Sequence, residues 1–298
     1  MTTNISDSQL LEFNKQGFIP GPNEQSYHFL SRVKDSLHFA NNIDEYLESS
    51  EELFPFRAED KIPTQEKESA FHICKTLFDM APSWVPAFYN NHDLSVWHGG
   101  SSWIPEVNEG SPIIFFQLRK AFKASSTYLW IYQRNEILSH EAVHVGRMAF
   151  HEPEFEEILA YRTSSSPLRR LLGPIIQSPE ETMAFALIIS FIVALDYFLL
   201  FTQNFSLYAT AMWLKLIPLF LILYGLWRIW KLHRVFEKCL ENLEALLSSK
   251  DKANAVIYRL TDKEIYRFSE DLSPTILQYA HENKSRSLRW RLLNIAYF

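Results

Sequence analysis

The sequence is poor in three features that mark secreted and nucleic-acid-binding proteins. It has only two cysteines, Cys74 and Cys239, in 298 residues, which excludes a disulfide framework and favours a reducing compartment. The segment from Met1 to Gly17 is polar and lacks the apolar core of a secretory signal. The formal net charge is −6, so the chain lacks the basic excess of a nucleic-acid-binding domain, and we expect no nucleic-acid partner.

Two long apolar runs stand out in the second half of the chain. Met183 to Phe201 holds 19 residues with one charge, Asp196, and Leu207 to Trp227 holds 21 residues with one charge, Lys215. Each run is long enough to cross about 30 Å of hydrocarbon as a helix. Because only five residues separate them, the two spans must form an antiparallel hairpin. We therefore expect the lipid bilayer as a partner.

Basic residues flank both ends of this hairpin, whereas its connecting loop has none. The positive-inside rule places both flanks in the cytoplasm. We expect an integral membrane protein with both termini cytoplasmic, of the bacterial inner-membrane kind. The flanking cations are Arg162, Arg169, Arg170, Arg228, Lys231, Arg234 and Lys238.

The two charges inside the apolar runs require partners, because charge in hydrocarbon is costly. Folding the hairpin about Asn204 places Asp196 eight residues and Lys215 eleven residues from the bend, at depths within about one helical turn of each other. The spacing predicts a mutual pair or contacts across an oligomer interface. The alternative is that Lys215 extends to the nearer membrane surface.

A short motif, His140-Glu141-Ala142-Val143-His144, carries the chemistry. Two histidines four residues apart lie on one face of a helix, so both imidazoles can reach one ion. Such a pair is typical of Zn²⁺ sites, in which the zinc acidifies a water and a neighbouring carboxylate accepts its proton. Glu141 is the candidate general base. The alternative is a histidine pair on a partly buried helix face.

The helix that carries the motif is expected from Glu136 to about Phe150, with Asn135 as its N-cap. A catalytic zinc site needs a third protein ligand and an open position. His151 would lie about 10 Å along the helix from His144, too far to share the ion. A second helix, Glu154 to about Thr163 after Pro153, offers carboxylates instead. The two candidate ligands on it are Glu156 and Glu157.

From Ser126 to Thr163 the chain resembles the gluzincin metalloproteases, in which an HExxH helix is followed by a helix with a glutamate ligand. Several such families have a small residue three positions after this glutamate, and Glu157 with Ala160 matches that pattern. The resemblance implies Glu157 as third ligand, with Glu156 as the fallback. The sequence departs from these families in its short histidine-to-glutamate spacing. It also has Tyr161 where an acid often supports a ligand histidine, so either oxyanion stabilisation or packing is open to this tyrosine.

The resemblance also implies a substrate strand laid along a sheet edge above the metal. The candidate edges are two expected strands, Ile113 to Leu118 and Ser126 to Tyr132, the latter from Tyr128 onward. His92 and His98, near Gly99-Gly100, are candidates for the cleft rather than ligands.

The rest of the chain is expected to be largely helical. Tyr27 to Leu47, Thr64 to Met80 and Arg228 to Ser248 have helical periodicity. The tail from Ser287 to Phe298 is both basic and apolar, so it either lies on the anionic leaflet or docks on the catalytic domain.

These observations predict an α+β fold with a compact zincin-like catalytic domain, a small sheet plus an active-site helix, and a two-helix transmembrane hairpin. Residues 1–180 are expected to form a cytoplasmic metalloprotease-like domain, 181–231 the hairpin and 232–298 a cytoplasmic C-terminal helical region.

The function predicted is a membrane-anchored zinc endopeptidase acting on protein or peptide substrates. His140, His144 and Glu157 would hold Zn²⁺ and Glu141 would act as the base. The alternative is a non-catalytic, membrane-tethered module for metal binding or protein interaction.

Overall fold

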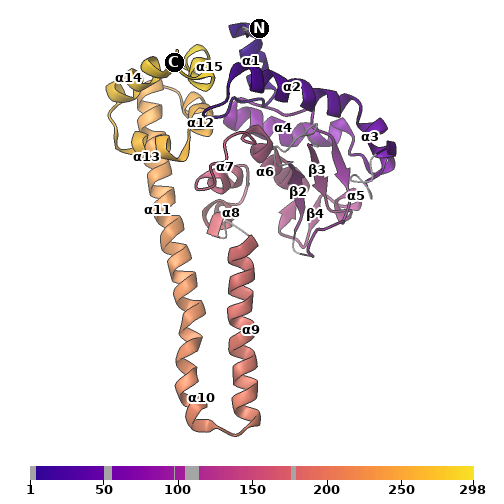
Figure 1. Ribbon diagram of the computed structural model, residues 1–298, viewed down its shortest axis with the longest axis vertical. Helices are drawn as coiled ribbons and strands as arrows, with labels where there is room; N and C mark the ends of the chain where they lie inside the picture. Colours follow the sequence, from indigo (N-terminus) through magenta and orange to yellow (C-terminus); the bar gives the residue numbers. More distant parts are fainter. Residues whose placement is uncertain (1–4, 50–55, 97, 105–113, 176–178) are drawn as a thin grey trace.

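The computed structural model describes residues 5–49, 56–96, 98–104, 114–175 and 179–298. It consists of a mixed α and β domain and a long helical hairpin that extends from one side of it (Figure 1). The first and last helices, α1 and α15, both lie in the domain, at the end remote from the hairpin tip (Figure 1).

The elements that precede the hairpin are mostly short. They are α1 (Asp7–Lys15), α2 (Ser26–Asn41), α3 (Ile43–Ser49), η2 (Ala58–Asp60), α4 (Thr64–Phe78), β1 (Ala87–Tyr89), β2 (Gly100–Trp103), β3 (Phe115–Leu118), α5 (Ala121–Ala124), β4 (Thr127–Tyr128), β5 (Tyr132–Gln133), α6 (Arg134–Gly146), α7 (Glu156–Tyr161), α8 (Pro167–Leu172) and η3 (Gly173–Ile175). The hairpin and the C-terminal part contain α9 (Pro179–Phe201), α10 (Phe205–Ala211), η4 (Met212–Lys215), α11 (Leu216–Leu247), α12 (Lys250–Tyr258), α13 (Asp262–Glu270), α14 (Ser273–Asn283) and α15 (Leu288–Ala296).

The three-stranded sheet has the order β1-β3-β2, with β1 parallel and β2 antiparallel to β3. The strand expected from Ile113 to Leu118 is observed as β3, which begins at Phe115; Ile113 itself lies outside the described residues. All four residues of β3 are buried and both of its edges are paired. The expectation that this segment offers a free edge for substrate is therefore wrong, and β2 is an outer strand.

The expectation of a single strand from Ser126 to Tyr132 is also wrong. The segment forms a tight two-stranded hairpin, in which β4 pairs with β5 and the chain turns at Leu129 and Trp130. Both turn residues have left-handed backbone angles, with φ of 49° and 60°. Bulky residues rarely adopt this conformation, so nothing in the sequence indicated a turn. The β-branched and aromatic residues therefore predicted one continuous strand.

The hairpin consists of two helical arms. The structure has two helices long and apolar enough to cross a membrane, Glu181–Phe201 and Phe205–Leu247, within the residues described. The second arm combines α10, η4 and α11. Its 3₁₀ turn, which ends at Lys215, lies just before Pro218, whose ring removes a backbone N–H from the helix. The helix expected from Arg228 to Ser248 is the continuation of α11 into the domain.

The predicted pair of charges inside the hairpin is present. Lys215 Nζ lies 2.8 Å from Asp196 Oδ2 and 3.5 Å from the Tyr208 hydroxyl. The two arms thus share one polar contact in an otherwise apolar stretch, which fixes their relative depth.

Segments before and after the hairpin pack around one hydrophobic core. Leu138 and Val143 of α6 belong to the same buried cluster as Phe236 of α11 and Val256 of α12. The expected boundaries near residues 180 and 232 therefore do not separate two independent cores. In the tail, Trp290, Leu292 and Leu293 of α15 are buried. Of the two alternatives for the tail, docking on the domain is the one observed.

The C-terminal part contacts the end of α6 directly. Tyr258 donates a hydrogen bond of 2.7 Å to the carbonyl of Val143. Gly146 makes room for this contact, because a Cβ atom there would lie 2.2 Å from the Tyr258 hydroxyl. The buried guanidinium of Arg147 donates to the carbonyls of Tyr258 and Leu260, at 2.5 and 3.1 Å. Residues made after the hairpin therefore fix the end of α6.

The ion pair between the two arms can be tested by charge exchange. Asp196→Lys or Lys215→Asp alone leaves two like charges at one depth, so each should lower the thermal unfolding temperature of the protein in lipid nanodiscs. The exchanged double variant restores an opposite pair and should unfold closer to the wild-type temperature than either single variant. A double variant less stable than both single variants would contradict the pairing.

Candidate metal centre

Helix α6 presents both histidines of the motif to one cleft. It begins at Arg134 after the N-cap Gln133, not at the expected N-cap Asn135, and ends at Gly146. The helix is shorter than expected because the chain turns away where Arg147 enters the core. Its buried residues anchor it in the core: Leu138, Ala142, Val143 and Val145 are fully buried.

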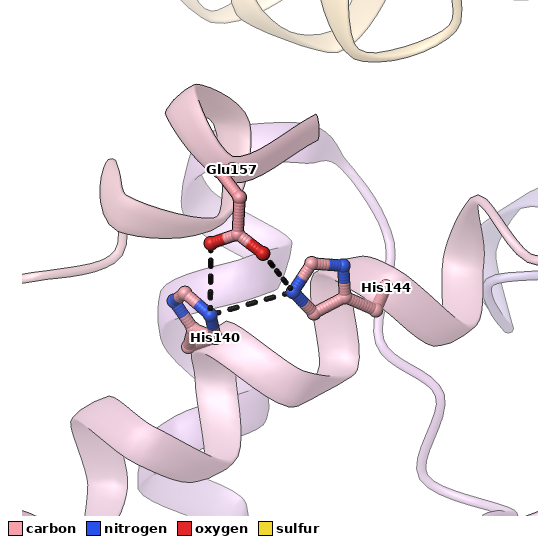
Figure 2. Close-up of side chains that lie close together, drawn as sticks. All are labelled: His140, His144 and Glu157. Atoms are coloured by element: carbon pink, nitrogen blue, oxygen red, sulfur yellow. Dashed lines mark hydrogen bonds and ion pairs between the residues drawn. The ribbon is translucent and has the colours of Figure 1, made fainter. Parts of the chain in front are cut away.

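The two imidazoles and the Glu157 carboxylate converge on one point (Figure 2). The Nε2 atoms of His140 and His144 are 3.3 Å apart. Glu157 reaches over both rings from α7, with Oε2 3.6 Å from His140 Nε2 and Oε1 3.5 Å from His144 Nε2. These three residues form a group that can hold a metal ion.

The spacing of these donors fits a small tetrahedral cation. Zinc–nitrogen and zinc–oxygen distances of about 2.0–2.1 Å in a tetrahedron separate neighbouring donor atoms by about 3.3 Å. The observed separations of 3.3, 3.5 and 3.6 Å are close to this value. Three protein ligands would leave a fourth position open towards the cleft.

Glu157 is positioned by a short helix that the C-terminal part holds at its start. Helix α7 spans six residues, shorter than the expected segment from Glu154 to Thr163. Asp262 accepts hydrogen bonds from the backbone N–H groups of Glu154 and Phe155, at 2.9 and 3.3 Å. Ala160 on α7 is fully buried. A carboxylate remote in sequence therefore fixes the turn from which Glu157 projects.

Glu156, the fallback ligand, has a different place. Its Oε1 lies 2.8 Å from Nδ1 of His144, on the side of the ring opposite the metal-facing Nε2. Neighbouring helix residues point about 100° apart, so only one of two adjacent glutamates can face both Nε2 atoms. A carboxylate on the outer nitrogen fixes the ring orientation and the tautomer of a metal ligand. In a metal site built from this group, Glu156 would be the acid that supports His144.

Burial and charge shift the pKa values of these groups in opposite directions. Burial, with the nearby charges of His144 and Arg169, holds the pKa of His140 well below its usual value. Burial also disfavours charge on His144, but its hydrogen bond with Glu156 and the charge of Glu157 outweigh this effect and raise the pKa to about 9. Burial raises the pKa of Glu157, although the charge of His144 opposes this. Without metal, His144 is therefore cationic and His140 neutral at pH 7.

The centre lies in a cleft of about 1110 Å³. The cleft is lined by residues of β2, α6 and α7 and by Thr182, Met183 and Ala186 from the first two turns of α9. Strand β2 can approach α6 closely because it begins with Gly100. A Cβ atom there would lie 2.8 Å from Ile137 Cγ2 and 2.7 Å from the Gln117 carbonyl oxygen.

Glu141 lines the same cleft. Among the residues that the structure describes, none forms a hydrogen bond or ion pair with its carboxylate. Tyr161 also lines the cleft and packs edge-on against His140, with ring centroids 4.6 Å apart. Burial and the charge of Glu157 raise the pKa of Tyr161 to about 12, so its hydroxyl stays protonated and can donate.

The other histidines considered lie outside the donor group. His98 lines the cleft, as its position near the glycine pair suggested. His92 instead pairs with Asp93 at 3.1 Å. His151 lies beyond the end of α6 with a left-handed φ of 52°.

Sequence reasoning missed Arg169 as a residue of the site. It was noted only as a charge beside the membrane, yet it lines the cleft and pairs with the buried Glu136 of α6 at 2.9 Å. Its guanidinium thereby joins α8 to the helix that carries the histidines. No local sequence signal marks this contact, because the two residues are 33 positions apart.

The donor group predicts stoichiometric binding of one Zn²⁺ per chain. His140→Ala and Glu157→Gln should each abolish stoichiometric binding, because the first removes a donor and the second replaces an anionic carboxylate with a weakly donating neutral amide. Glu156→Gln should weaken binding about 10–100-fold, as expected for a residue that orients a ligand. Competition with a chromophoric chelator measures these affinities. Glu59→Gln, an exposed carboxylate elsewhere, is the matched control; full affinity in Glu157→Gln would contradict the assignment.

Metal affinity should also depend on pH. Because the pKa of His144 is about 9, a bound cation must displace the imidazole proton below that pH. The apparent affinity for Zn²⁺ should rise about tenfold per pH unit between pH 7 and 8 and level off above pH 9. Titration calorimetry in buffers of different ionisation enthalpy counts the released proton. A value near zero at pH 7 would contradict this charge state.

Comparison of the chain with protein-family models, with curated proteins and with solved structures finds no match. The site is therefore interpreted from its own residues and geometry.

Proposed function

We propose that this protein is a membrane-anchored, zinc-dependent endopeptidase with a zincin-like catalytic domain. The observation that carries the proposal is the convergence of His140, His144 and Glu157 in an open cleft that also contains the unengaged carboxylate of Glu141. A ligand set of two imidazoles and one carboxylate is the one used by several catalytic zinc sites. The separations between its donor atoms support a tetrahedral ion.

His140, His144 and Glu157 would hold the ion, and Glu156 would orient His144. Zinc held by these residues would supply Lewis acidity, which would make a water molecule at the site more acidic and a substrate carbonyl more electrophilic. Glu141 accepts the water proton as the oxygen attacks the carbonyl carbon, and it then delivers that proton to the leaving amine nitrogen as the C–N bond breaks. Tyr161 is the candidate donor to the developing oxyanion.

The cleft favours an extended polypeptide as substrate. Strand β2 is an outer strand of the sheet and lines the cleft beside the histidines. A peptide can add to such an edge through main-chain hydrogen bonds, which present its scissile bond without requiring a particular side chain. The edge is not one of the two segments suggested by the sequence, but it serves the same purpose.

Residues at the base of the hairpin support anchoring in a bilayer. Arg228 of α11 pairs with Glu181 of α9 and donates to the Ile175 carbonyl, at 2.5 and 2.9 Å. This charged level separates the domain from the apolar arms, and the 19 residues from Met183 to Phe201 span about 29 Å. We place the domain and both termini in the cytoplasm, because the basic residues lie on this side.

The alternative is a metal-binding module without catalytic activity. A structural zinc site is usually closed by four protein ligands. In the part of the chain that the structure describes, the group has three, and it opens into a cleft. The site therefore favours the enzyme.

The proposal predicts that Glu141→Gln keeps zinc but loses activity. The substitution preserves shape and removes the base, so kcat/KM for a quenched-fluorescence peptide mixture should fall about 10²–10⁴-fold while zinc content stays at one per chain. The control is Glu59→Gln, which should cleave normally. Equal cleavage by purified Glu141→Gln would end the peptidase proposal, and zinc binding without any cleavage by the wild type would favour the alternative.

A further inference from the structure

The β4–β5 hairpin carries an exposed apolar tip. Leu129, Trp130 and Ile131 are 53%, 98% and 59% exposed. The first two have left-handed backbone angles, a conformation that favours asparagine or glycine in tight hairpins. The turn nevertheless holds a leucine and a tryptophan with little protein around them. Exposed apolar side chains that lie together often mark a site of contact with another protein or with a membrane.

More apolar side chains lie next to this tip. Leu168 and Leu171 of α8 are 66% and 50% exposed. Arg169, between them, donates a hydrogen bond of 3.1 Å to the Ile131 carbonyl, which holds α8 beside the tip. Its guanidinium also lies 5.0 Å from the ring of Tyr132 in β5. We call the five exposed side chains the apolar rim; they are Leu129, Trp130, Ile131, Leu168 and Leu171.

The rim lies on the side of the domain from which the hairpin leaves. Figure 1 places β4 and α8 level with the upper end of α9. The His233 ring on α11 is 3.2 Å from the Leu171 carbonyl. His233 is five residues above Arg228, or about 8 Å along the helix. With Arg228 at the edge of the hydrocarbon, as the charged level proposed above implies, α8 would lie at the outer boundary of the headgroup layer, which is roughly 5–8 Å thick.

Charge and residue type fit a lipid surface. Arg170 of α8 and the α11 residues Lys231 and Arg234 are exposed near the same level, and cations there attract anionic lipid headgroups. Tryptophan is the residue most typical of the membrane interface, where its ring contacts acyl chains and its N–H stays hydrated.

From these observations we infer that the apolar rim docks on the headgroup region of the leaflet from which α9 and α11 emerge. The inference rests on the membrane insertion proposed above, but it does not depend on peptidase activity. The rim gives the domain a second attachment beside the hairpin. Two attachments fix the tilt of the domain, and with it the direction in which the metal cleft opens.

A fluorescent label can test this contact in the full-length protein. Both native cysteines are buried, so an introduced cysteine is labelled selectively. Leu129→Cys, labelled with a polarity-sensitive dye, keeps Trp130 in place. The protein is reconstituted in nanodiscs of phosphatidylcholine and phosphatidylglycerol, with and without lipids that carry a nitroxide near the headgroup. The controls are Phe191→Cys on α9 and Tyr27→Cys on α2, positions that are 63% and 66% exposed.

The rim predicts that the label at position 129 loses most of its emission to the nitroxide lipids, whereas the label at position 27 does not. Adding Trp130→Glu to the labelled Leu129→Cys chain should restore the emission, because a carboxylate is repelled by the anionic surface. Position 191 should be quenched by nitroxides placed deep in the acyl chains, which tests insertion of the hairpin separately.

Three results would overturn the inference. Quenching at position 191 but not at 129 leaves the anchor intact and removes the docking surface. A blue-shifted emission at 129 that is insensitive to nitroxide lipids shows that protein, such as a second copy, covers the rim. Absence of quenching at 191 as well rejects the membrane insertion on which the docking surface rests.

Discussion

The site depends on how α7 crosses α6. Helix α6 supplies only two donors, the rings of His140 and His144. The third donor, the Glu157 carboxylate, comes from the second helix, α7. Helix α7 has six residues, too few for stability on its own, so its position is set by contacts from outside. Asp262 supplies one by accepting from the backbone N–H groups that begin the turn, and Tyr258 fixes the end of α6. The arrangement of the three donors therefore depends on residues that follow the hairpin as well as on α6 and α7.

The electrostatics of the site follow from the same packing. Burial penalises charge on each of the three donors, yet Glu156 and Glu157 together keep His144 protonated in the metal-free protein. A divalent cation held by this group would replace the proton, so that two neutral rings and a carboxylate would face it. Burial, with the charges of His144 and of Arg169, which also lines the cleft, holds the pKa of His140 low and keeps its ring neutral.

The sequence predicts the features that depend on local periodicity. The two apolar runs predicted the two helical arms. The distance of each charge from the bend predicted the pairing of Asp196 with Lys215. The motif spacing predicted that the rings of His140 and His144 share one face. The structure also brings the carboxylate of Glu157 within 3.6 Å of both rings. Strand β2 was not predicted, because Gly-Ser-Ser-Trp lacks apolar alternation and begins with glycine, which is depleted in strands. The contact of Asp262 with the turn before α7 joins positions more than a hundred residues apart, and single-sequence periodicity carries no signal for such pairs.

The order of these elements along the chain has a consequence for biogenesis. Asp262 follows Glu157 by 105 residues, and both arms of the hairpin lie between them. In a chain inserted into a bilayer during synthesis, both arms would leave the ribosome before Asp262, the brace for α7, does. The half of the chain that contains the two histidines would therefore stay incomplete until the hairpin has been made. In that case, assembly of the donor group would follow insertion of the hairpin.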